Sequence, residues 1–172
     1  MSKHSFHRKV SALACAIATA IVGIDFSLGV KPAHADTDCR KVVTGTYLTT
    51  NSGDFGSFRS LITFTQDGNF FATASNQSGV PSIQPYGNTQ GSWKCTSDRE
   101  ITATTLDFNY PTATLPGAIS KSDFRATFDP KNGTVQATAT LRSFSLDANP
   151  LNDDAPVVGT FTFTGQRVKP GQ

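Results

Sequence analysis

Apolar and polar residues alternate along most of this chain from Asp36 onward. Successive side chains of a β-strand point to opposite faces, so such alternation indicates strands with one buried face and one wet face. No window carries the 3.6-residue apolar repeat of an amphipathic helix. Threonines fill much of the wet face, and the clearest candidate inward residues are Phe58, Ser60, Ile62 and Phe64; Val135, Ala137, Ala139 and Leu141; and Val157, Gly159, Phe161, Phe163 and Gly165.

Turn-forming residues divide the chain into segments. Asp67-Gly68 and Asn132-Gly133 are typical of tight hairpins, and the longer connections 78–87, 111–118 and 147–156 carry prolines. Short links make neighbouring strands antiparallel, and a set with no crossover helix fits an up-and-down barrel or a sandwich. The pattern predicts eight strands, at Val42–Thr50, Ser57–Gln66, Asn69–Asn76, Asn88–Thr96, Glu100–Asn109, Ile119–Asp129, Thr134–Phe144 and Val157–Val168.

The first 35 residues differ from the rest. A basic start with Lys3, Arg8 and Lys9 precedes an apolar run, which ends at the small-x-small triplet Ala33-His34-Ala35. This is the pattern of a secretory signal peptide. Polar residues and an aspartate interrupt the apolar run, so we expect a cleaved leader, with no stable membrane span left after cleavage. The sequence therefore predicts a signal peptide at 1–35, one domain at 36–172, and a secreted or periplasmic location.

Removing the leader changes the charge and the available chemistry. Four of the 15 Lys and Arg residues and one of the 13 acids lie in the leader, which leaves 11 bases and 12 acids. A near-neutral domain lacks the basic surface that nucleic-acid binding requires. All three histidines also lie in the leader, so the mature domain has no Ser-His-Asp or Cys-His pair and no histidine ligand for zinc. We expect no cofactor and no metal, and the oligomeric state stays open.

Two cysteines remain after the leader, Cys39 and Cys95. An even pair in a chain sent to an oxidising compartment predicts a disulfide, whereas a reactive free thiol would need a basic partner. The disulfide would close a loop of more than fifty residues. In the chain-entropy treatment such a loop contributes about 3–4 kcal/mol.

Short motifs at the two ends of the mature chain carry a resemblance. Gly45-Thr46-Tyr47 opens the first predicted strand, while Gly159-Thr160-Phe161 and Gly165-Gln166-Arg167-Val168 belong to the last. Together with Gly91-Ser92-Trp93, they resemble the calycin superfamily and its small secreted bacterial lipocalin-like proteins. The resemblance implies an eight-stranded antiparallel up-and-down barrel, of lipocalin or avidin type, in which an aromatic residue stacks on a basic residue where the barrel closes. Tyr47 stands where that superfamily usually has tryptophan.

The residues themselves support the same closure. Arg167 falls on the same side of its strand as Phe161 and Phe163, and a buried guanidinium is costly unless it is paired. If the first and last strands adjoin, Tyr47 is the obvious partner, with a cation–π contact worth about 1–2 kcal/mol. We therefore expect Gly45, Tyr47 and Arg167 to form a structural barrel closure. The alternative is that Arg167 extends into solvent at a frayed end.

Candidate binding residues are aromatic. An eight-stranded barrel either fills its interior with side chains or holds one small ligand there. The connections 78–87 and 111–118 are the expected mouth of such a pocket. Either a packed core or the wall of an apolar pocket fits the six inward phenylalanines Phe58, Phe64, Phe124, Phe128, Phe161 and Phe163.

Acidic residues give little sign of catalysis. Asp107 and Asp123 lie in predicted strands, and we expect both to face solvent in cross-strand charge pairs with Lys121 and Arg125. The acidic loop 147–154 lacks the glycine and terminal glutamate of an EF-hand, so a solvated turn is the preferred interpretation over a calcium site.

Three function hypotheses follow from export, barrel and aromatic interior. The first is a binding module that holds a small apolar molecule in the barrel. The second is an envelope or extracellular protein that acts through its outer surface and has no pocket. The third is a histidine-free cyclase or isomerase, which would require an inward carboxylate with a strongly raised pKa, and the sequence makes none evident.

Overall fold

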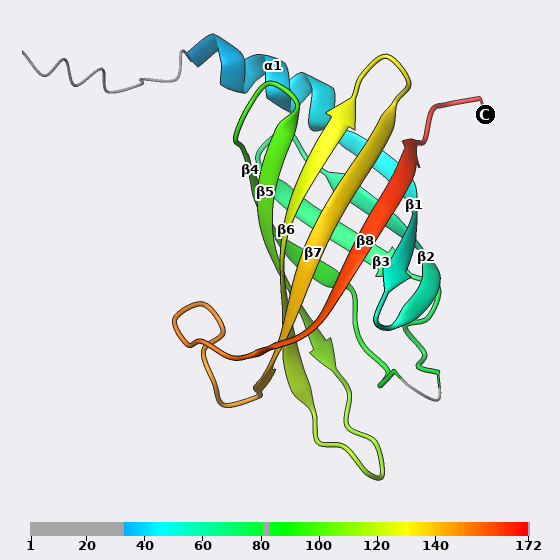
Figure 1. Cartoon of the computed structure of the whole chain (residues 1–172), viewed down its shortest axis with the longest axis vertical. Coiled ribbons are helices and arrows are strands. Elements are labelled where there is room, and N and C mark those ends of the chain that lie inside the picture. The colour runs from blue at the N-terminus through cyan, green and yellow to red at the C-terminus, as the bar shows by residue number, and fades with distance from the viewer. Residues whose placement is uncertain (1–32, 81–82, 172) are drawn as a thin grey trace, which may run out of the picture. The chain divides into compact units, whose positions relative to one another are not determined.

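The structure is a computed structural model that describes residues 33–80 and 83–171. One helix and eight strands follow each other along the chain (Figure 1). The strands form one closed antiparallel barrel in sequence order, so the predicted eight-stranded barrel is confirmed and the sandwich is excluded. The elements are α1 (Ala33–Val43), β1 (Gly45–Gly53), β2 (Gly56–Phe64), β3 (Asn69–Ala74), β4 (Thr89–Cys95), β5 (Glu100–Asn109), β6 (Ala118–Asp129), β7 (Thr134–Ser145) and β8 (Val157–Arg167).

Alternation and turn chemistry account for these strands. Buried and exposed positions alternate along the strands, with Ile62 and Phe64 inside and Leu61 outside on β2. The β2–β3 turn contains Gly68 at φ +95°, and the β6–β7 turn contains Gly133 at φ +68°, a region that favours glycine. The expected hairpins at Asp67-Gly68 and Asn132-Gly133 are therefore present.

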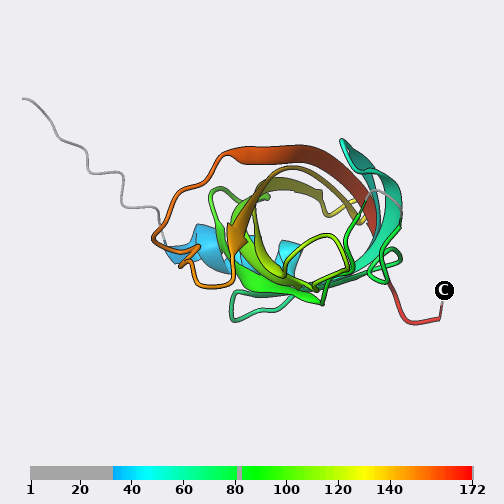
Figure 2. The ribbon, with the colours of Figure 1, turned by 90° about the horizontal axis from the view of Figure 1, so that it is seen from below.

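Helix α1 was not predicted from the alternation. The expected first strand began at Val42, which is wrong for Val42 and Val43, because both belong to α1 and β1 begins at Gly45. Cys39 and Val43 are one helical turn apart and fully buried in the barrel core. The helix lies where the chain crosses one end of the barrel. Figure 2 looks into the opposite, open end, and α1 is seen behind the barrel. Of the expected leader 1–35, residues 1–32 lie outside the described residues.

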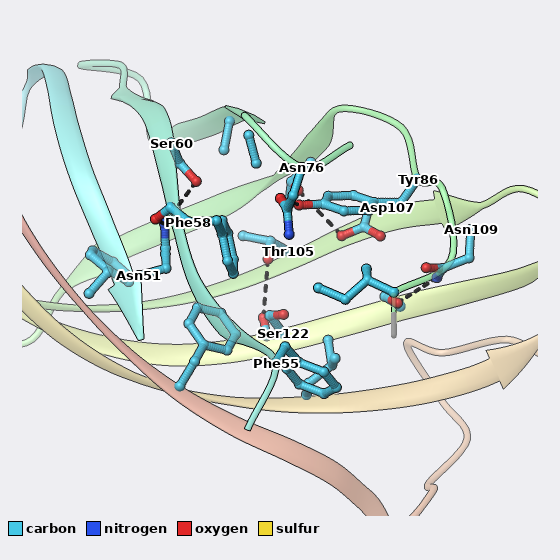
Figure 3. A pocket seen from close by; sticks show the side chains of 18 of the residues that line it. Asn51, Phe55, Phe58, Ser60, Asn76, Tyr86, Thr105, Asp107, Asn109 and Ser122 are labelled. Atoms are coloured by element: carbon cyan, nitrogen blue, oxygen red, sulfur yellow. Dashed lines mark hydrogen bonds between the residues drawn. The ribbon is translucent and has the colours of Figure 1, made fainter. Parts of the chain in front are cut away.

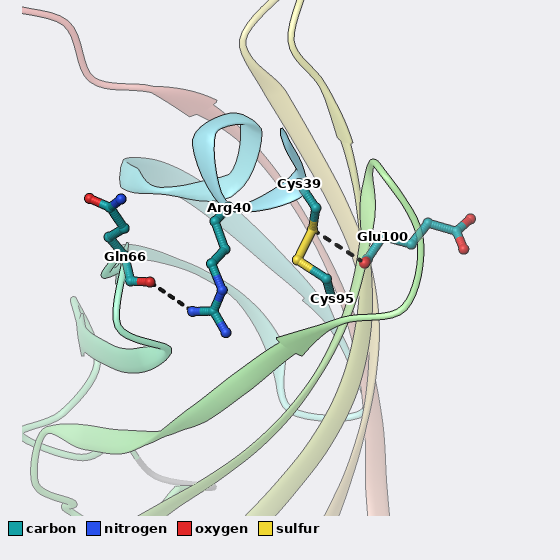
Figure 4. The surroundings of a disulfide bond; sticks show 5 residues. All are labelled: Cys39, Arg40, Gln66, Cys95 and Glu100. Carbon is teal, nitrogen blue, oxygen red and sulfur yellow. Dashed lines mark hydrogen bonds between the residues drawn. A yellow bond between two sulfur atoms is a disulfide. The ribbon is translucent and has the colours of Figure 1, made fainter. Parts of the chain in front are cut away.

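The disulfide joins this helix to the barrel wall. Cys39 of α1 is bonded to Cys95 at the end of β4, with Cα atoms 6.3 Å apart (Figure 4). Next to it, the Arg40 guanidinium lies 5.3 Å from the centre of the Trp93 ring and donates a 2.7 Å hydrogen bond to the carbonyl of Gln66. The predicted Cys39–Cys95 disulfide is confirmed, and it holds α1 over the end of the barrel.

Arg167 and Tyr47 meet where β1 pairs with β8. The two residues are directly paired in the register, and the guanidinium lies 5.2 Å from the centre of the Tyr47 ring. Arg167 Nε and Nη2 donate to Tyr47 Oη at 3.1 and 2.7 Å, and Nη2 also donates to the carbonyl of Val42. Tyr47 Oη donates in turn to the carbonyl of Val43 at 3.0 Å. These bonds connect both edges of the barrel seam to the C-terminal end of α1.

Gly45 completes this contact by being small. A Cβ added at Gly45 would lie 3.3 Å from Arg167 Cζ, and its φ of +148° is rarely adopted by other residues. Burial raises the pKa of the Tyr47 hydroxyl, and the neighbouring Arg167 offsets part of that increase. Tyr47 therefore stays neutral and able to donate to the helix carbonyl.

Removing the disulfide should destabilise the barrel. Cys39 and Cys95 are 56 residues apart, so replacing both by alanine should lower the free energy of unfolding by about 3–4 kcal/mol. Urea unfolding of the oxidised protein and of the Cys39→Ala/Cys95→Ala variant measures the difference. A reductant should leave the variant unchanged, and equal stability of the two proteins would contradict a structural role for the bond.

Removing the Arg167 side chain should destabilise the seam. In Arg167→Leu the Tyr47 hydroxyl and the Val42 carbonyl lose a charged donor, which should cost about 2–4 kcal/mol of unfolding free energy. Arg125→Leu, on the exposed face of β6, is the matched control and should stay within about 0.5 kcal/mol of the wild type. Equal losses in the two variants, measured by urea unfolding, would show that the seam contact adds nothing.

Candidate ligand-binding site

The barrel interior is hollow at the end opposite α1. A cavity of about 350 Å³ opens there, lined by inward residues of the barrel strands and by the connections between them (Figure 3). Ile83, Gln84 and Tyr86 of the β3–β4 connection and Leu115 of the β5–β6 connection lie on its rim. Gln84 Nε2 donates to the carbonyls of Tyr110 and Pro116 at 2.5 and 2.9 Å, which ties the two connections together. The expected mouth loops thus line the cavity.

The floor of the cavity is aromatic. Phe70, Phe124 and Phe163 are buried and line its base, and Phe124 packs edge-to-face on the other two with ring centres 5.4 and 5.5 Å away. On the α1 side of this floor, Phe64 lies between Phe70 and Phe128, with ring centres 5.2 and 5.4 Å away. Edge-to-face packing of this kind fills the half of the barrel next to α1 densely. A ligand can therefore enter only the half of the interior that lies away from α1.

The six phenylalanines expected in the interior are all inside, but at two levels. Phe58, Phe124, Phe161 and Phe163 line the cavity. Phe64 and Phe128 belong to the packed core under the floor and do not line it. Only the first four are therefore in position to contact a ligand in the cavity. Phe55, in the β1–β2 turn, adds a further aromatic wall and packs against Gly159, where a Cβ would come within 2.3 Å of its ring.

Polar side chains lie in the half of the interior away from α1, around the cavity. Asn51 Nδ2 donates to Ser60 Oγ at 2.9 Å, and Asn109 Nδ2 donates to Ser120 Oγ at 2.6 Å. Thr105 Oγ1 donates to the carbonyl of Ser122 at 3.4 Å. Figure 3 shows Asn51 beside Ser60, and Thr105 beside Ser122, around the cavity. They leave a lining that is mostly apolar in surface, with a few placed polar atoms, as small-molecule sites have.

Asp107 points into this cavity, which corrects the expectation that it faces solvent. β5 places Ile101, Ala103, Thr105 and Asp107 on its inner face, and Asp107 pairs with Ser120 of β6. Asp123 lies on the outer face of β6, as expected, but it forms its ion pair with Arg142 of β7, at 3.3 Å, instead of with the expected Lys121 or Arg125. The two acids were assigned to one face, and the antiparallel register separates them.

The environment of Asp107 disfavours its charge. Burial raises the pKa of its carboxyl to about 6, and a hydrogen bond from Thr89 Oγ1 to Oδ2 at 3.3 Å offsets only part of this. A carboxyl with such a pKa inside a cavity is typical of binding and catalytic sites, although structural networks also produce it.

Tyr86 lies beside Asp107 and is held firmly. Its backbone N–H donates to the carbonyl of Gln77 at 2.9 Å, and it forms a β-bridge with Asn109. Its hydroxyl donates to Asn76 Oδ1 at 2.5 Å (Figure 3). Burial and the Asp107 carboxylate raise the pKa of Tyr86 to about 12, so the hydroxyl stays neutral.

Comparison with known proteins identifies the fold and no family. No protein-family model matches the sequence, and no curated protein matches it. A solved structure described as EF1p2_mFAP2b bound to DFHBI is similar, with a TM-score of 0.54 and 13% sequence identity, covering 78% of this chain and 100% of that one. At this identity the likeness shows the shared barrel fold alone.

The Cys39–Cys95 disulfide is compatible with an extracellular or periplasmic protein. Within residues 33–80 and 83–171, no helix has the length and apolarity needed to cross a bilayer.

Sequence reasoning missed Asp107, Tyr86, Asn76 and Asn51 as cavity residues. For Asp107 a signal existed, because Ile101 and Ala103 share its parity on β5 and are apolar. Tyr86 lies in a long connection with no periodicity, so its inward position depends on tertiary hydrogen bonds. Asn51 reads as a turn residue near the β1–β2 hairpin.

Replacing Asp107 by asparagine should stabilise the protein at neutral pH. Because the pKa of Asp107 is raised in the folded state, the folded protein binds more protons than the unfolded chain between about pH 4 and pH 6. Stability therefore falls as the pH rises through that window, by at most about 3 kcal/mol. Asp107→Asn lacks this loss, so its advantage over the wild type should grow by about 1–3 kcal/mol from pH 4.5 to pH 7.5.

Urea unfolding of both proteins at the two pH values measures this change. Asp123→Asn is the matched control on the outer wall, and it should not stabilise the protein at neutral pH, because it removes the ion pair with Arg142. An advantage of Asp107→Asn that is the same at both pH values would show that the carboxyl is not desolvated.

Proposed function

We propose that this protein binds a small, largely apolar molecule inside its barrel. The cavity carries the proposal: one end of the barrel is sealed by α1 and packed aromatic rings, and the other end holds about 350 Å³ of space above an aromatic floor. Phe58, Phe124, Phe161 and Phe163 would contact the apolar body of the ligand. A core that only stabilised the fold would gain free energy by filling this space.

Rigidity of the site supports the same proposal. The floor belongs to the packed core, and the rim connections are tied to each other and to β5 by hydrogen bonds. A site that is formed before the ligand arrives binds more tightly, because little conformational freedom is lost on binding. The similar solved barrel was determined with DFHBI bound, which shows that such a fold can hold a small molecule.

Export is part of this proposal. The signal-peptide pattern at 1–35 and the disulfide support a role in the periplasm or outside the cell, and the terminal motifs support a place among calycin-like carriers. A secreted barrel with an apolar lumen suits the capture or transport of a molecule that is poorly soluble in water.

Asp107 gives a second candidate function. A histidine-free isomerase or cyclase requires an inward carboxyl with a raised pKa, and Asp107 is such a carboxyl, with a pKa of about 6. Binding is the stronger proposal, because the neighbouring donors Asn109 and Tyr86 are bonded to other side chains. Mass spectrometry of a co-purified ligand before and after long incubation separates the two, since an enzyme would convert it and a carrier would not.

A cavity-filling variant tests the binding proposal. N-phenylnaphthylamine is an uncharged dye that fluoresces in apolar surroundings, and the wild type should bind it with a saturable increase in emission. Ala72→Phe places a ring in the cavity and should weaken binding at least tenfold. Thr138→Phe adds the same ring to the exposed face of β7 and should bind like the wild type.

Urea unfolding shows whether each variant is folded. Absence of dye binding to the wild type, or unchanged affinity in a folded Ala72→Phe protein, would contradict a ligand site in the barrel.

A further inference from the structure

The cavity has an unusual charge distribution. Among the described residues that line it, Asp107 is the only charged one, and no lysine or arginine is present. A carboxylate placed among apolar and neutral polar groups is costly unless a cation or several donors accompany it. The barrel has ample cations elsewhere, but the lining provides none to this group.

The neighbours of Asp107 leave its carboxylate largely unpaired. The hydrogen bond from Thr89 reaches Oδ2, and no other partner is found for the carboxylate among the described residues. Asn109 of the same strand donates to Ser120, which faces Asp107 from β6. Tyr86, from the β3–β4 connection, is the titratable group that faces it, and its proton is directed to Asn76. Figure 3 shows the carboxylate exposed to the cavity beside the Tyr86 ring.

We propose that the molecule held in the barrel carries a protonated amine that pairs with Asp107, while its apolar body rests on the phenylalanine floor. This inference rests on the proposed binding function and names the chemical class of the ligand. An ammonium brings the positive charge and the donors that the cavity lacks, so its charge-assisted hydrogen bond replaces the missing partner of the carboxylate. The Tyr86 hydroxyl has free lone pairs to accept a second hydrogen bond from it.

Aromatic rings in the cavity lining favour a cation further. Phe55, Phe58 and Phe161 line the wall, and Tyr86 adjoins Asp107. The faces of such rings attract ammonium groups, most strongly where water is excluded. An anionic ligand would meet the Asp107 charge with no cation to compensate it, so the cavity selects against carboxylates and phosphates.

Three compounds of one shape test this inference. Naphthylethylamine, naphthylethanol and naphthylacetate differ only at the head group, and displacement of N-phenylnaphthylamine measures the affinity of each at pH 8. The amine should bind about ten- to hundredfold more tightly than the alcohol, the range expected of a buried charge-assisted hydrogen bond. The acid should bind most weakly of the three.

Asp107→Asn should remove the preference without removing the site. In this variant the amine should fall to the affinity of the alcohol, and the affinity of the alcohol should change by less than about twofold. Asp123→Asn is the matched control, because it removes the same charge from the outer wall, and it should keep the full preference for the amine.

The pH dependence gives an independent readout. The amine stays protonated from pH 8 to pH 5, as a lysine side chain does, whereas Asp107 takes up a proton over that interval. The ratio of amine to alcohol affinity should therefore fall towards pH 5 in the wild type and stay flat in Asp107→Asn.

The outcomes separate this inference from the proposed function. If the alcohol binds as tightly as the amine, or if the preference survives in Asp107→Asn, the assignment of an amine ligand is overturned while the binding function stands. If the dye and all three compounds fail to bind the wild type, the proposed function fails as well.

Discussion

Everything in this protein depends on the pairing of β1 with β8. When these strands meet, the sheet has no free edge and acquires an inside and an outside, which is what allows a cavity to exist. Arg167 and Tyr47 secure that pairing at one end, and their hydrogen bonds reach the last carbonyls of α1. The same cluster therefore stabilises the pairing of β1 with β8 and holds α1 against the end of the barrel.

The sealed end decides where open space is found. α1, the disulfide and the packed rings around Phe64 fill the interior at one end of the barrel. The remaining volume therefore lies at the opposite end, inside the rim. Polar side chains increase towards that rim, where water can satisfy them. The result is a gradient from dense aromatic packing to a partly polar chamber.

Asp107 stands out against this gradient. Burial raises the pKa of its carboxyl, and among the described residues that line the cavity a hydrogen bond from Thr89 offsets only part of this, with no cation beside it. Residues that destabilise a fold and make no compensating structural contact are often functional. The carboxylate and the apolar floor are the two features on which we base the proposed ligand, with a cationic end and an apolar body.

Local sequence determined the strands, the hairpin turns and the disulfide, because alternation, Asp-Gly and Asn-Gly turns and a lone cysteine pair are each readable without knowing the fold. Tertiary structure decided the rest. Phe58 and Phe64 share one face of β2, yet the height of each along the tilted barrel makes the first a cavity wall and the second core. α1 lies over one end of the barrel because Cys39 and Val43 are buried in the core and the disulfide joins it to β4, and Tyr86 points inward because β5 holds its backbone. Neither position is set by a local pattern, since both depend on strands that meet only after the barrel has closed.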